Sequence, residues 1–308
     1  MSTWSTDPRG LDLRRRRLPA RLAVGGALLC PSACAYTLET VNGVPAARDA
    51  DVMSYAEYNS LDHLQPYVLH LGGDSGAVVY FGARHTTRPA DPQIDSIETL
   101  WAHFRPTVAL VETRRGWRGS LNGNVKQFGE SSAGVAFARR DGIPVYTLDA
   151  PLETEIATLL GEWSRVRVTM FYVLRSYTAR SPASRSDGQA SELLRERGRW
   201  PGLGGVLTTV SGMDSAWARE FPGEAGWREL PWQATWPNRT DSWLNALAAH
   251  ANRFRDQRMI ALITTLVGRG ERVFAIVGSS HVVMQERELR EALGADTITA
   301  AGSRRHPR

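Results

Sequence analysis

The chain has 308 residues, of which 42% are hydrophobic and 22% are charged, and its formal net charge is +5. This is the composition of a globular protein, long enough for one large domain or two small ones. Residues 1–35 hold six arginines and two aspartates, so they contribute +4 of the +5. A chain that begins at residue 36 carries a net charge near +1, which removes the main electrostatic support for nucleic-acid binding.

The first 35 residues have the pattern of a secretory signal peptide. A basic start at 9–17 is followed by a short apolar stretch at 18–29, and Ala33-Cys34-Ala35 is a small-x-small cleavage site. The adjacent arginines leave a twin-arginine export route open, and Pro31 disfavours a lipoprotein. We expect an exported chain, 36–308, that is periplasmic or extracellular. Both cysteines leave with the leader, which excludes a disulfide, a cysteine-ligated metal and a cysteine nucleophile.

After a polar lead-in at 36–65, strand and helix patterns alternate, which indicates parallel βαβ units and an α/β fold. A turn at 72–76, "GGDSG", joins the first two strands. The predicted strands are 66–71, 77–82, 107–112, 143–149 and 272–278. The predicted helices are 94–104, 130–140, 151–163, 242–266 and 286–294. No other stretch is long and apolar enough to span a membrane, so we expect no membrane span after the leader.

Two segments interrupt this alternation. Residues 113–128 are polar and glycine-rich, which predicts a long loop. Residues 177–240 are rich in Gly, Pro, Arg and Trp, and we predict an irregular insertion there. The insertion is either a lid over a site or a surface excursion whose aromatic side chains pack on one another.

Two apolar strands end in the same pattern, Gly-x-x-His. "YFGARH" ends in His85 and "VFAIVGSSH" ends in His281, while the strand "TVALVE" ends in Glu112. In an open α/β sheet, ligands bind outside the carboxyl ends of the strands, so we expect these three side chains to share one site. Two imidazoles and a carboxylate can bind a divalent metal, or a histidine base can be oriented by the carboxylate. The alternative is that both histidines are structural.

Five short motifs in this order carry a resemblance to a known family. They are "YFGARH", "TVALVE", "FGE" at 128–130, "RDQRMI" at 255–260 and "AIVGSSH". The pattern resembles the TraB/TIKI superfamily, which also groups erythromycin esterase-like and haem-binding ChaN-like proteins, over about residues 67–293. The resemblance implies two α/β halves that meet at one site.

The resemblance also implies roles for individual residues. The TIKI branch is known for metal-dependent proteolysis, so His85, Glu112 and His281 would form the core site and hold a divalent metal ion. Glu130 and Arg255 match further polar positions of the family, and Arg255 could stabilise a developing oxyanion. An ion pair between Arg255 and Asp256 is the alternative. The branches of the superfamily do not all use metal.

We therefore expect an exported hydrolase, metal-dependent in the leading hypothesis, that acts on a peptide or small-molecule substrate at a peptide or ester-type bond. An extracytoplasmic haem, metal or small-ligand binding protein without turnover is the alternative, and a scaffold whose histidines only pack is a third. "GESSAG" at 129–134 nearly matches a serine nucleophile elbow. We expect a helix start there instead, because no buried strand precedes it.

Overall fold

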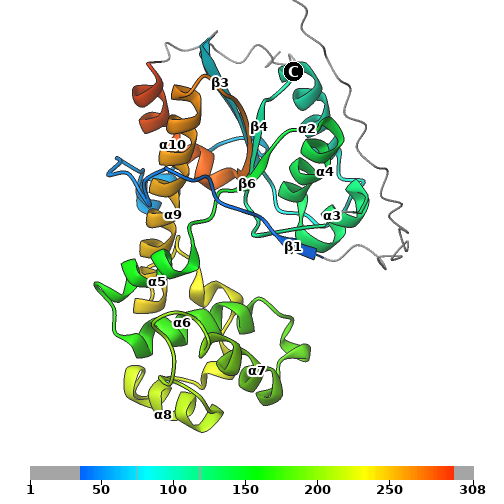
Figure 1. The fold of residues 1–308 in the computed structure, drawn as a ribbon. Helices are drawn as coiled ribbons and strands as arrows, with labels where there is room; N and C mark the ends of the chain where they lie inside the picture. Colours follow the sequence, from blue (N-terminus) through cyan, green and yellow to red (C-terminus); the bar gives the residue numbers. More distant parts are fainter. Residues whose placement is uncertain (1–34, 74, 118, 295–308) are drawn as a thin grey trace, which may run out of the picture. The chain divides into compact units, whose positions relative to one another are not determined.

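The computed structural model describes residues 35–294 except residues 74 and 118 (Figure 1). The expected leader, residues 1–35, lies outside the described residues apart from Ala35. The strands are β1 (Ala35–Thr37), β2 (Tyr67–Gly73), β3 (Gly76–Ala83), β4 (Val108–Val111), β5 (Arg115–Trp117), β6 (Val145–Thr147) and β7 (Arg272–Gly278). The helices are α1 (Tyr55–Tyr58), α2 (Pro92–Phe104), α3 (Leu121–Phe128), α4 (Ala133–Asp141), α5 (Leu152–Leu160), α6 (Arg165–Thr178), α7 (Asp187–Arg197), α8 (Val210–Glu220), α9 (Trp243–Gly268) and α10 (Ser279–Leu293).

This arrangement confirms the α/β class. Five strands form one mixed sheet in the order β2-β3-β7-β4-β6, and β1 pairs with β5 in a separate two-stranded sheet. β2 and β3 form the predicted antiparallel hairpin, whereas β3, β7, β4 and β6 run parallel. β3 comes from the first half of the chain and β7 from the second, so the two halves meet within one sheet. The parallel strands place their carboxyl ends at one edge of this sheet.

Both faces of the central strands are covered by helices, as expected for parallel strands made almost entirely of apolar residues. Val78 and Tyr80 of β3 pack in a core that includes α9 and α10. Val79 and Phe81 face the other way, into a core with residues of α2 and α4. Figure 1 shows these two pairs of helices on opposite faces of the sheet.

The loop predicted for residues 113–128 is wrong, because this segment contains β5 and α3. Helix α3 follows Ser120, whose hydroxyl oxygen accepts a hydrogen bond from the Gly123 N–H. Val125 is buried, and Leu121 packs against the same core. Two apolar residues four positions apart in a polar segment are too sparse a pattern to predict a helix. The last helix also begins earlier than predicted, at Ser279, directly after β7.

Residues 177–240 are more regular than the irregular insertion we predicted, since they contain α7 and α8. With α5, α6 and the first turns of α9, these helices enclose a hydrophobic core of their own. Trp217 stacks on Phe221 with 4.1 Å between ring centroids, and Phe221 stacks on Trp243 at 5.4 Å. The aromatic side chains thus pack on one another, as the second alternative for this segment expected.

No helix in the described part of the chain is long and apolar enough to cross a membrane.

Candidate functional site

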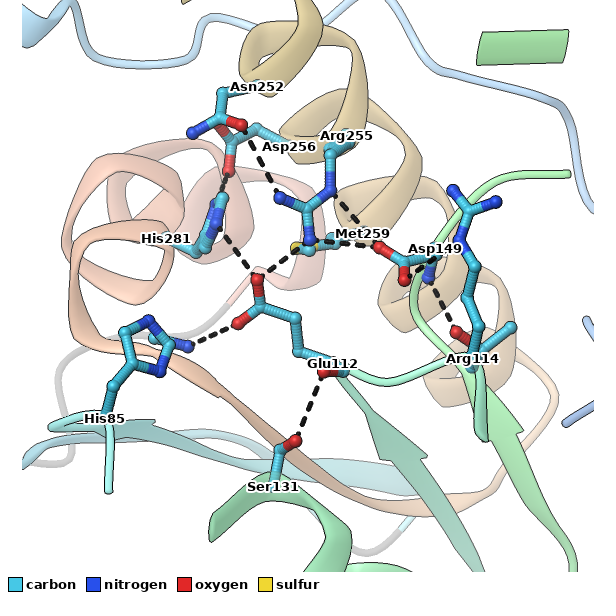
Figure 2. A network of polar contacts seen from close by, with 12 residues as sticks. His85, Glu112, Arg114, Ser131, Asp149, Asn252, Arg255, Asp256, Met259 and His281 are labelled. Atoms are coloured by element: carbon cyan, nitrogen blue, oxygen red, sulfur yellow. Dashed lines mark hydrogen bonds and ion pairs between the residues drawn. The ribbon is translucent and has the colours of Figure 1, made fainter. Parts of the chain in front are cut away.

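The structure brings His85, Glu112 and His281 together at the carboxyl edge of the sheet. His85 lies in the loop after β3, Glu112 follows β4, and His281 is in the first turn of α10, directly after β7. The strands pair in the order β3-β7-β4, so the three segments are neighbours. Figure 2 shows both imidazole rings beside the Glu112 carboxylate.

The two glycines of the Gly-x-x-His motifs allow this close approach. A methyl group on Gly82 would lie 2.8 Å from the Ser279 Cα and 2.9 Å from the Tyr67 carbonyl oxygen. One on Gly278 would lie 3.0 Å from His85 Nε2 and 3.6 Å from a Glu112 carboxylate oxygen. His85 and Glu112 therefore both lie against the backbone at the end of β7, where any side chain would intrude.

His85 is an exposed imidazole held from behind by a buried carboxylate. Its Nδ1 is 2.9 Å from Glu130 Oε1, and the other oxygen, Oε2, accepts the Thr86 N–H at 2.8 Å. The His85 side chain is 75% exposed, whereas that of Glu130 is 4% exposed. A carboxylate only accepts, so Nδ1 carries a proton and Nε2 is the atom left for chemistry. The hydrogen bond to Glu130 raises the pKa of His85; partial desolvation of the ring by the neighbouring residues opposes this shift, and the Glu112 charge adds to it.

The loop that carries His85 is fixed at the start of α2. The Gln93 side chain accepts the Arg84 N–H at 3.1 Å and donates to the Arg84 carbonyl at 2.6 Å. These two hydrogen bonds hold the backbone of Arg84, one residue before His85. They therefore restrict the positions that the His85 imidazole can adopt.

Glu112 is an anchored anion. Its Oε1 accepts a hydrogen bond from Arg255 at 2.8 Å, and its Oε2 accepts the Gly278 N–H at 2.8 Å. Burial alone would raise the pKa of Glu112, but the Arg255 guanidinium and the two histidines lower it to about 2. The carboxylate is thus charged at any physiological pH.

Arg255 is a buried cation shared by two carboxylates. Besides Glu112 it binds Asp149 Oδ1, from Nε at 3.2 Å and from the terminal nitrogen at 3.0 Å. Its remaining nitrogen donates to Asn252 at 3.5 Å. The alternative of an ion pair with Asp256 is wrong: Arg255 binds Glu112 and Asp149 instead. Four of its five N–H groups are engaged in these contacts, so its main role in the structure is to position Glu112.

His281 differs from His85 in being buried, with a side chain 6% exposed. Its Nδ1 is 2.6 Å from Asp256 Oδ1, an oxygen that also accepts from Gln285 at 2.6 Å. Its Nε2 lies 3.7 Å from Glu112 Oε1. Burial lowers the pKa of His281, but the charge of Asp256 and its hydrogen bond outweigh this effect and raise it. The imidazole therefore lies between two carboxylates.

Three residues of this network were not predicted from the sequence. Asp149 ends the strand predicted at 143–149, so the strand-end argument that identified Glu112 also applies to it. Asp256 is the second residue of "RDQRMI", and Gln285 lies one helical turn after His281. Beyond Asp149 the ion pairs continue through Arg114 to Glu155, at 3.2 and 2.8 Å.

A cavity of about 710 Å³ opens beside His85. It is lined by residues 85–88, by Glu112 and by residues 127–131. Residues 177–240 contribute none of these lining residues, so the alternative of a lid over this cavity has no support in the described chain.

The serine-nucleophile alternative also lacks support. Ser131 Oγ donates to the Glu112 carbonyl at 3.2 Å, and Ser132 Oγ donates to the Gly129 carbonyl. Among the described residues, neither hydroxyl is hydrogen-bonded to a histidine. As expected, "GESSAG" forms the start of a helix, through the 3₁₀ turn η1 (Glu130–Ser132) that leads into α4.

The donor types at this site fit a divalent metal ion. Both histidines have Nδ1 on a carboxylate, the arrangement that orients imidazole for metal binding through Nε2, and Glu112 supplies oxygen. The side chains in their present positions do not form a complete metal-binding site. Among residues 35–294, as far as they are described, no group of three or more histidine, aspartate or glutamate side chains is placed to hold an ion.

The site as a whole has an excess of negative charge. Five carboxylates are buried or nearly so: Glu112, Glu130, Asp149, Glu155 and Asp256. Three arginines oppose them, because Arg175 interacts electrostatically with Glu112 and Glu155 in addition to the ion pairs of Arg114 and Arg255. With both histidines neutral, as metal binding requires, two negative charges remain. Such a site favours an added cation.

Comparisons of the chain with protein-family models, curated proteins and solved structures found no match. The resemblance to the TraB/TIKI superfamily therefore stays a prediction that depends on the five motifs.

Proposed function

We propose that the protein is an exported hydrolase that acts on a peptide or ester-type carbonyl, with His85 as its general base. The observation that carries this proposal is the His85–Glu130 pair. An exposed imidazole faces a cavity of about 710 Å³ while a buried carboxylate fixes its Nδ1–H at 2.9 Å. This is the geometry of a histidine base oriented by a carboxylate.

In this proposal, a water molecule in the cavity gives one proton to His85 Nε2 as its oxygen attacks the carbonyl carbon. The tetrahedral intermediate then collapses with cleavage of the C–N or C–O bond, and the His85 imidazolium returns the proton to the leaving amine or alkoxide. Glu130 stabilises the imidazolium that forms, because its charge lies against Nδ1–H. Glu112 lies against the same stretch of backbone as His85 Nε2 and orients the water by accepting a hydrogen bond from its other O–H, which stays on the oxygen. Arg255 and the Gly278 N–H hold Glu112 in place and keep it charged.

A divalent cation would be held by the Nε2 atoms of His85 and His281 and by Glu112. Bound there, it would lower the pKa of water and polarise the carbonyl. Asp256 and Glu130 would keep the two imidazoles oriented, and the negative charge of the surrounding carboxylates would favour the ion.

Turnover of 4-nitrophenyl esters and of quenched fluorescent peptides tests the proposal. The His85→Ala variant should lose about 10² to 10⁴ of kcat/KM, the typical contribution of a general base. Glu130→Gln should lose less, because it keeps a hydrogen-bond acceptor for Nδ1. His103→Ala, an exposed histidine on α2 away from the site, is the matched control and should keep full activity. Equal activity of the His85→Ala variant would overturn the proposal.

Metal content, measured by mass spectrometry on the wild-type protein and on a His85→Ala/His281→Ala double variant, separates the two forms of the mechanism. If the wild type contains stoichiometric metal, the double variant contains none, and a chelator abolishes turnover, the protein is a metallohydrolase. Turnover without metal supports the histidine base alone. Metal bound without any turnover would overturn the hydrolase and favour the binding protein, for which the excess of carboxylates is the supporting observation.

A further inference from the structure

A second cavity, of about 640 Å³, lies elsewhere in the molecule. It is bordered by residues 52–55, by the end of α5, by the segment 237–242 and by one side of α9. It shares no lining residue with the cavity at His85. Its volume is within the range of about 300–1,000 Å³ that small-molecule sites occupy.

One wall of this second cavity is apolar. Val52, Phe254 and Met284 are largely buried beneath it, and Met53 and Ala249 complete this surface. These side chains belong to three separate segments of the chain, and none of them offers a charge. The wall suits an aliphatic chain.

His250, on α9, contributes a hydrogen-bond donor to the same cavity. The Trp163 indole Nε1–H, which can only donate, lies 3.0 Å from His250 Nδ1. Nδ1 must therefore accept, and the neutral ring carries its proton on Nε2. The Glu162 carboxylate is 3.5 Å from the same Nδ1, but it is 72% exposed and cannot donate to it. No acceptor for Nε2–H is found among the described residues.

Arg253 follows three residues later on α9, so it lies beside His250 on the helix surface. Of the cavity's two arginines, Arg239 is paired with Asp241. Arg253 has no carboxylate partner in the part of the chain that the structure describes. An unpaired guanidinium and an imidazole N–H beside an apolar wall are complementary to an anionic head group on an apolar tail.

We propose that this second cavity binds a monocarboxylic acid with an aliphatic tail. The carboxylate accepts from Arg253 and from His250 Nε2–H, and the tail lies along Val52, Phe254 and Met284. The site is independent of the proposed hydrolytic centre, because the two cavities have no residue in common.

Calorimetric titration of the full chain with decanoate, and separately with decan-1-ol, tests this proposal. Decanoate should bind with one equivalent and more tightly than the alcohol. Arg253→Gln should weaken the binding of decanoate by about tenfold or more, because a charge-assisted hydrogen bond is lost, and should leave the affinity for decan-1-ol unchanged. Arg219→Gln, an exposed arginine on α8 outside the cavity, is the matched control and should bind decanoate like the wild type.

Two further variants keep the result unambiguous. Ala249→Trp should fill the cavity and abolish binding of both ligands, and circular dichroism should show that the variant folds. His85→Ala should bind decanoate unchanged. Decanoate binding that is lost in His85→Ala, or that is insensitive to both Arg253→Gln and Ala249→Trp, would overturn the proposal. So would the absence of saturable binding at about 1 mM decanoate, which corresponds to about −4 kcal/mol.

Discussion

Ala83 of β3 is the register partner of Gly278 of β7, and this pairing places the two Gly-x-x-His motifs side by side. One residue earlier, Gly82 presses against Ser279, where α10 begins. The repeated motif is thus explained by packing at one sheet edge: Gly82 allows the backbone at Ser279 to approach, and Gly278 allows the His85 ring to approach. His281 Nε2 then lies 3.7 Å from the Glu112 carboxylate, and the His85 ring lies near the same carboxylate, close enough for its charge to act on His85.

The two glycines should respond differently to alanine. In Gly82→Ala the new methyl group meets backbone atoms at 2.8 and 2.9 Å, which cannot move independently of the sheet. We expect a loss of about 1–3 kcal/mol in the free energy of unfolding, as for other overpacked positions. In Gly278→Ala the methyl group meets the exposed His85 ring, which can shift, so stability should change little while turnover falls. Urea unfolding and ester hydrolysis measure the two effects.

Gly226→Ala is the control for this pair, since a methyl group there meets nothing within 4 Å. Equal loss of stability in both motif variants would show that the contact at Gly278 is as rigid as that at Gly82.

Replacing Arg255 with an uncharged residue should lower the free energy of unfolding substantially. Arg255→Met leaves Glu112 and Asp149 with no guanidinium between them, although both are largely buried. Breaking one side of such a buried ion pair typically costs about 3–5 kcal/mol of stability. Arg253→Met, two residues away on the same helix but exposed, should change stability by less than about 0.5 kcal/mol. Urea unfolding of both variants checks the difference, and similar values would contradict the role given to Arg255.

The pH dependence of turnover should follow the protonation of His85. Its pKa is raised chiefly by the hydrogen bond to Glu130. In the proposed mechanism the neutral ring is the base. The rate should therefore rise with pH through this raised pKa. In Glu130→Gln the charge is absent, so the pKa should fall and the acid limb of the profile should move to lower pH. NMR titration of the His85 ring gives the same pKa without an assay, and an unchanged titration in Glu130→Gln would contradict this cause.

Much of this arrangement could be predicted from the sequence, because parallel strands place their carboxyl ends at the same edge of a sheet. Apolar runs that end in His85 and Glu112 predicted the correct edge, and the parallel sheet brings those ends together. The same logic, applied to the strand at 143–149, would have found Asp149. The environments of the histidines could not be predicted, because the two motifs are locally alike. After Ala83 the chain enters a loop and exposes His85, whereas after Gly278 it enters α10 and buries His281.

The missed helices have a similar cause. α3 buries few apolar side chains, and the segment around α7 and α8 is rich in Gly, Pro and Trp, which favours turns. In both places tertiary packing decides the structure, against a weak local pattern. The aromatic residues that suggested an irregular insertion are the ones that fill its core, such as Trp217 and Trp227.

The Asp256–His281 pair offers a test of the buried side of the site. Asp256→Asn keeps an oxygen that can accept from His281 and Gln285, but it removes the charge that raises the pKa of His281. The new amide NH₂ would take the place of Oδ2, which has no hydrogen-bond partner among the described residues. We therefore expect a fall in the His281 pKa, seen by NMR, and a loss of about 1–3 kcal/mol in stability from the unsatisfied donor.

Asp241→Asn, at an exposed aspartate, is the control for this variant and should change neither quantity. If Asp256→Asn leaves the His281 pKa in place, the charge that holds the proton on His281 is that of Glu112. In that case the double variant Asp256→Asn/Glu112→Gln should lower the pKa where the single one did not. If the His281 pKa falls in the single variant, Asp256 is the residue that fixes the protonation of His281. Asp256 then also fixes the orientation of His281 Nε2, which lies 3.7 Å from Glu112.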